Sequence, residues 1–113
     1  MAEISDAKVI GKIVEKFLHI VNTKGVIVSR DGDKYYIRCD GYTLVVEEDD
    51  EDDDRLRASF YNGTGEELCH YNFTIAEDKH LYAQICDRLL AYCDEKLQYA
   101  RKMKDIQEFL DNH

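Results

Sequence analysis

Three turn-forming dipeptides constrain the fold of this chain more than any other feature of its sequence. Asp31-Gly32, Asp40-Gly41 and Asn62-Gly63 each combine glycine with a residue that tolerates a positive φ, as tight hairpin turns require. The segments around them are rich in Val, Ile, Tyr and Phe, which favour strands. We therefore predict five strands, joined in sequence as an antiparallel meander, at residues 26–29, 34–39, 42–46, 56–61 and 67–73.

Helical patterns flank the predicted sheet on both sides. From Ser5 to Val21 apolar residues recur at helical spacing, which predicts an N-terminal helix. Thr74 followed by Glu77 forms a capping box, which predicts a second helix that begins near Ile75. No glycine follows Gly65 and the chain contains no proline, so no residue is expected to interrupt this helix before residue 113.

The predicted fold class is therefore α+β. It has an N-terminal helix, a five-stranded antiparallel meander sheet and a long C-terminal helix, with both helices on one face of the sheet. A length of 113 residues with 44% hydrophobic content suits one domain with a modest core. We expect a single α+β domain over residues 1–113, with a flexible acidic loop at 47–54.

The predicted C-terminal helix is longer than the sheet it would cover. About 36 residues at about 1.5 Å each give roughly 54 Å, whereas five strands at about 4.8 Å spacing give roughly 24 Å. The distal half should therefore present its apolar stripe to a partner, and a second copy of the chain, giving a homodimer, is the simplest one. The alternative is a break near residues 94–96 that folds the last segment back onto the domain. The candidate partner-binding residues are the apolar Leu97, Met103, Ile106 and Leu110 and the basic rim Lys96, Arg101, Lys102 and Lys104.

One acidic run dominates the net charge of −9. Residues 47–54 supply eight of the 24 acids, so the remaining 16 nearly balance the 15 basic residues. Such a run predicts a solvated loop, and its charge disfavours direct binding of nucleic acid. It does not match a calcium-binding loop, because the sharp-turn glycine and the terminal glutamate are missing. Its central residues are candidates for docking a basic surface, including the basic rim of a second subunit: Asp49, Asp50, Glu51, Asp52 and Asp53.

The expected location is the cytoplasm. No segment has the apolar length of a membrane span, and the first residues lack the pattern of a signal peptide. The four cysteines include no CxxC pair, so we expect reduced, mostly buried thiols rather than disulfides.

No motif of a known enzyme class occurs, and we expect no catalytic residue, metal or cofactor. Cys69 and His70 are adjacent in a predicted strand and therefore point to opposite faces, which prevents them from acting as a nucleophile and base. The alternative is a ligand pocket between sheet and helices, lined by tyrosines such as Tyr35, Tyr36, Tyr61 and Tyr71.

These patterns favour a non-catalytic, acidic protein-binding module: a small regulator, inhibitor or chaperone that acts by protein–protein interaction through its sheet face, its overhanging helix or its acidic loop. One alternative is an inhibitor that mimics nucleic acid, of the kind that phages encode against host defences. Another is a small-ligand-binding domain or an enzyme without a recognisable motif.

Overall fold

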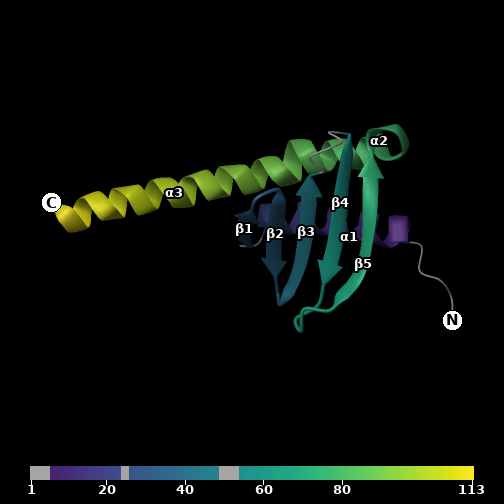
Figure 1. Ribbon diagram of the computed structural model, residues 1–113, viewed down its shortest axis with the longest axis horizontal. Helices are drawn as coiled ribbons and strands as arrows, with labels where there is room; N and C mark the ends of the chain where they lie inside the picture. Colours follow the sequence, from purple (N-terminus) through teal and green to yellow (C-terminus); the bar gives the residue numbers. More distant parts are fainter. Residues whose placement is uncertain (1–5, 24–25, 49–53) are drawn as a thin grey trace.

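The computed structural model describes residues 6–23, 26–48 and 54–113, and it confirms the predicted α+β fold. An N-terminal helix precedes a five-stranded antiparallel sheet, and a long helix follows it (Figure 1). The helices and strands are α1 (Asp6–Thr23), β1 (Ile27–Asp31), β2 (Lys34–Cys39), β3 (Tyr42–Glu48), β4 (Arg55–Tyr61), β5 (Glu67–Thr74), α2 (Ile75–Gln84), the π-helical segment η1 (Ile85–Leu90) and α3 (Ala91–Asn112).

The sheet is the predicted meander, with strand order β1-β2-β3-β4-β5 and antiparallel pairing throughout. Two residues, Asp40 (φ 52°) and Gly41 (φ 85°), connect β2 to β3. Both have positive φ, which matches the twist of the flanking strands and explains the Asp-Gly sequence. The other two predicted turns differ in detail, because Asp31 still belongs to β1 and the positive φ after β4 occurs at Gly65 (φ 86°) rather than in Asn62-Gly63.

One face of the sheet forms the core with the helices. Alternate strand residues such as Tyr35, Ile37, Leu44 and Val46 point to this face and are buried. In Figure 1, α1 lies behind the sheet as viewed. The core contains Ile10, Val14, Phe17, Leu18, Val21, Val26, Tyr35, Ile37, Leu44, Val46, Leu56, Ala58, Phe73, Ile85, Leu89, Leu90 and Cys93.

The C-terminal helical region is less regular than the sequence suggests. Thr74 caps α2 as predicted, since its hydroxyl accepts a hydrogen bond of 3.2 Å from the amide of Glu77. Asp78 then departs from helical geometry (φ −126°, ψ 34°). Its carboxylate accepts hydrogen bonds from the Thr74 amide (3.1 Å) and the Tyr71 hydroxyl (3.2 Å). The prediction of one uninterrupted helix is wrong here, because these contacts hold the first turn against β5.

The π-helical segment η1 lies between α2 and α3. A π-helical turn has wider hydrogen bonding than an α-helix and changes which residues share a face. Within η1 the side chains of Ile85, Leu89 and Leu90 are all buried. The segment therefore attaches the root of α3 to the core.

α3 extends well beyond the sheet. Its 22 residues are continuous, without the alternative break near 94–96, and they span about 33 Å. Figure 1 shows α3 passing the β1 edge and ending far from the sheet. The longest dimension of the molecule, α3 included, is 61 Å. Every residue from Gln98 onward is exposed. The distal half of α3 thus has no cover from the described part of its own chain.

Polar contacts fix the direction of α3 at its root. Asp94 accepts a hydrogen bond of 2.9 Å from the buried hydroxyl of Tyr35 and lies 3.5 Å from the Arg30 guanidinium. Arg30 also stacks over the Tyr35 ring, with its central carbon 4.6 Å from the ring centre. The ammonium of Lys96 donates a hydrogen bond of 2.7 Å to the carbonyl oxygen of Val26. These contacts join α3 to the β1–β2 hairpin.

Candidate functional site

The sheet face opposite the core carries polar and aromatic side chains in rows across the strands. The strand register places Tyr36, Val45, Ser59 and His70 in one row. A second row contains Lys34, Glu47, Arg57 and Asn72, and a third contains Arg38, Thr43 and Tyr61. We call this surface the open face.

A depression with a volume of about 740 Å³ lies on the open face. Val45 and Ser59 form its floor, and they are 9% and 5% exposed although they face away from the core. Longer side chains around these two residues explain their low exposure: Lys34, Tyr36, Arg38, Arg57 and Tyr61. Short residues in the middle strands, with long ones on either side, therefore create the hollow.

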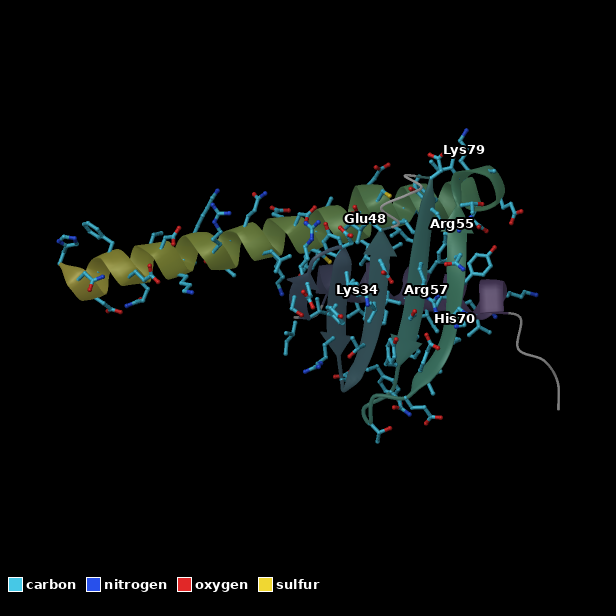
Figure 2. The ribbon with its side chains drawn as sticks, viewed as in Figure 1. Lys34, Glu48, Arg55, Arg57, His70 and Lys79 are labelled. Atoms are coloured by element: carbon cyan, nitrogen blue, oxygen red, sulfur yellow. The ribbon has the colours of Figure 1, made fainter. Side chains whose placement is uncertain are left out.

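The depression is basic in a chain that is acidic overall. Three cations line it, Lys34, Arg38 and Arg57, with Glu47 as the acid among the lining residues. In Figure 2 the labels of Lys34, Arg57 and His70 lie over this face of the sheet. The carboxylate of Glu67 offsets part of this positive charge, since it lies 3.9 Å from the Arg57 guanidinium and 3.5 Å from the His70 ring. The lining residues nevertheless carry a net charge of +2, against −9 for the chain.

The loop between β4 and β5 forms one rim of the depression, and internal hydrogen bonds fix its shape. The side-chain oxygen of Asn62 accepts hydrogen bonds from the Thr64 amide (3.1 Å), the Thr64 hydroxyl (2.8 Å) and the Glu66 amide (3.0 Å). Gly65 has φ 86°, a backbone conformation that residues with a side chain rarely adopt. The rim is therefore already formed without a ligand.

The overhanging helix carries most of the residues predicted to bind a partner. Met103, Ile106 and Leu110 are 46%, 51% and 61% exposed. Leu97 is half-buried where the helix leaves the domain, and Lys96 is bonded to Val26 of its own chain. The remaining predicted basic residues are exposed: Arg101, Lys102 and Lys104.

Two aromatic residues of this helix were missing from the sequence prediction. Tyr99 is 66% exposed and Phe109 is 63% exposed. Tyr99 precedes Met103 by four positions, so the same helical spacing that selected Met103 and Ile106 could have identified it. The predicted acidic residues Asp49, Asp50, Glu51, Asp52 and Asp53 lie outside the described residues.

The tyrosines proposed to line a pocket between sheet and helices are divided between two faces. Tyr36 and Tyr61 line the depression on the open face. Tyr35 is buried in the core, and the Tyr71 hydroxyl is bonded to Asp78. Burial and the neighbouring carboxylates, Asp94 for Tyr35 and Asp78 for Tyr71, raise the pKa of both phenols. The Tyr35–Asp94 and Tyr71–Asp78 hydrogen bonds join helical residues to the sheet, and the four tyrosines do not line a single pocket.

The cysteines behave as packing residues where the structure describes their surroundings. Cys69 packs against the core whereas His70 pairs with Glu67 on the open face, so the two side chains lie on opposite faces of the sheet, as strand alternation predicts. Cys93 is fully buried, and burial together with the charge of Asp94 raises the pKa of its thiol to about 12. A thiol with such a pKa is a poor nucleophile at neutral pH.

Among the described residues, no group of three or more His, Cys, Asp or Glu side chains is arranged to hold a metal ion. None of the described helices has the length and apolar character needed to cross a membrane.

The comparisons with known proteins add no relative. No protein-family model, curated protein or solved structure matches this chain.

Proposed function

We propose that this chain is a non-catalytic protein-binding module, a small regulator, inhibitor or chaperone, which binds an acidic segment of a partner protein on its open face. The observation that carries the proposal is the depression, whose floor of Val45 and Ser59 lies between basic and aromatic walls. Such a surface offers area for contact and charges that select and orient the partner.

The charge distribution supports a protein partner of acidic character. A net charge of +2 on the lining residues attracts carboxylates locally, while the charge of −9 on the whole chain repels polyanions such as nucleic acids at long range. Tyr36 and Tyr61 add the aromatic contacts that are enriched in protein interfaces. No disulfide joins the four cysteines, all of which lie among the described residues; this fits a reducing compartment, and we place the interaction in the cytoplasm.

Affinity capture with the full chain tests the proposal. The wild-type protein is compared with the double variant Arg38→Glu/Arg57→Glu and with Ser59→Trp, which fills the floor of the depression. We expect at least one protein to be enriched from an extract of the source cell and to lose about ten-fold or more in recovery with both variants, because like charges across an interface are strongly unfavourable. Quantitative mass spectrometry measures the recovery.

A matched control separates the effect of changing the open face from the effect of changing the net charge of the protein. Lys8→Glu/Lys12→Glu changes two exposed residues of α1 and alters the net charge by the same amount. This variant should retain the captured protein, and circular dichroism should show the wild-type strand content in every variant. Equal recovery by the wild type and both open-face variants would refute the proposal, as would loss of the captured protein on nuclease treatment.

A further inference from the structure

The exposed apolar residues of distal α3 follow the spacing of a coiled coil. Tyr99, Met103, Ile106 and Leu110 are separated by four, three and four positions, and each is at least 46% exposed. At about 100° per residue they lie within a sector of roughly 60° on one side of the helix. An apolar seam with this period packs against another helix, because alternating steps of three and four keep the seam facing its partner.

The seam points away from the protein's own core. Cys93 is buried against the domain, and Tyr99 follows it by six positions. Six steps of about 100° place the two side chains roughly 120° apart around the helix. Bending α3 back toward the sheet would therefore not bury the seam without also rotating the helix.

A hollow suited to a side chain of another helix is already present on the same side. A depression of about 450 Å³ on α3 is lined by Tyr92, Glu95, Lys96 and Tyr99, together with Gln98 and Lys102. The first four residues occupy positions i, i+3, i+4 and i+7, which are the four that surround an inserted side chain in coiled-coil packing. The hollow thus extends the seam by one further layer.

The charges of α3 specify the direction of the partner helix. Residues 96–104 contain four cations and no acid, namely Lys96, Arg101, Lys102 and Lys104. Residues 105–112 contain three acids and no cation, namely Asp105, Glu108 and Asp111. The macrodipole of a lone helix favours cations near its C-terminal end, yet the last turn of α3 contains none. This distribution suits an antiparallel neighbour with the same sequence and would oppose a parallel one.

We propose that α3 pairs antiparallel with α3 of a second copy of this chain, about a two-fold axis between Lys104 and Asp105. In this register Tyr99 meets Leu110 of the second copy, and Met103 meets Ile106 of the second copy. Within each pair the two residues lie the same number of positions from the axis, so the apolar layers and the opposite charges align together. The hollow near Tyr92 then lies opposite the last turn of the second copy, where the ring centres of Phe109 and His113 are 4.8 Å apart.

The antiparallel pair leaves both open faces free. Only residues 96–113 overlap, over about 27 Å of helix, and the two domains lie at opposite ends. Two molecules of 61 Å that overlap in this way give a maximum dimension of about 95 Å, whereas a parallel pair would remain near 61 Å. The pairing and the proposed binding of an acidic partner therefore rest on separate surfaces and can fail separately.

Sedimentation equilibrium on the full chain tests whether α3 pairs. Measurements should run from about 1 µM to about 500 µM, because the dimer population follows mass action. We expect the wild type to dimerise and Met103→Ser/Ile106→Ser to raise the dissociation constant by about ten-fold or more, with unchanged strand content by circular dichroism. A wild type that stays monomeric over this range would overturn the proposal, and so would a variant that dimerises as tightly as the wild type.

Two further measurements test the direction of pairing. Lys102→Glu/Lys104→Glu should weaken the dimer by about ten-fold at low salt, whereas Lys8→Glu/Lys12→Glu on α1 makes the same charge change and should leave it intact. Small-angle X-ray scattering of the dimer should give a maximum dimension of about 95 Å. A dimer close to 61 Å in length, or equal weakening by both charge variants, would overturn the antiparallel arrangement.

Discussion

Replacing Leu89 by Ala is expected to lower the free energy of unfolding by about 2–5 kcal/mol. Leu89 is fully buried in η1, the segment that attaches α3 to the core. Truncating it removes apolar surface from the core and leaves a cavity, because neighbouring residues relax only in part. Urea denaturation followed by circular dichroism measures the change, at protein concentrations low enough to keep the chain monomeric.

Leu68→Ala is the matched control, because it makes the same chemical change at a position on β5 that is 48% exposed. It should cost about 1 kcal/mol or less, since about half of that residue stays in water and no closed cavity is left. Similar losses for the two variants would contradict the assignment of η1 as the attachment of α3 to the core.

A pH increase above 9 is expected to destabilise the fold strongly. Burial raises the pKa of the Cys93 thiol from its ordinary value of 9.0 to about 12. The unfolded chain then loses this proton at a lower pH than the folded chain does. The stabilisation is complete below pH 9 and is lost as pH rises toward 12, by at most about 4 kcal/mol for a shift of three pKa units.

Ionisation of Tyr35 at alkaline pH is expected to lower the stability of the fold as well. Burial and its hydrogen bond to Asp94 raise the pKa of the phenol above its ordinary value of 10.0. Its ionisation would also remove the donor that holds Asp94 at the root of α3. Alkaline pH should therefore loosen the attachment of α3 to the β1–β2 hairpin as well as the core.

Urea titrations under reducing conditions at a series of pH values measure this dependence. Cys93→Ala and Tyr35→Phe should each be less stable than the wild type at neutral pH, yet each should lose less stability as pH rises, because one titrating group has gone. Parallel pH profiles for the wild type and both variants would show that neither group carries the effect.

The two binding proposals share a structural basis in the way α3 is anchored. Tyr35 and Arg30 hold Asp94 through side chains that face the core, while Tyr36 and Lys34 of the same hairpin face the open depression. The hairpin thus supports the overhanging helix on one side and the proposed partner site on the other. Dimerisation through α3 would then join two such sites in one particle and increase the apparent affinity for a partner with two acidic segments.

Much of the fold was predictable because its signals are local. The Asp40-Gly41 turn has the positive φ values that its residues favour, and the Thr74 hydroxyl caps α2 as the capping box predicts. The bend at Asp78 was not predictable, since it depends on a hydrogen bond from Tyr71 in the preceding strand. The π-helical turn at 85–90 likewise reflects how three apolar side chains fit into the core.

The candidate sites divide in the same way. Neither the common face of Val45 and Ser59 nor the hollow that their neighbours enclose was predicted from the sequence, because both depend on the register of β2, β3 and β4. By contrast, the apolar spacing of Met103, Ile106 and Leu110 is visible in the chain itself.

The sequence by itself determined the order of helix, meander and helix, the Asp40-Gly41 turn and the charge pattern along α3, because each depends on neighbours within a few residues. Only the tertiary structure decided which part of α3 the domain covers. The contacts of Asp94 with Tyr35 and Arg30 join residues about sixty positions apart, and they direct α3 past the β1 edge. The exposure of the seam, and with it the proposed pairing, follows from that direction.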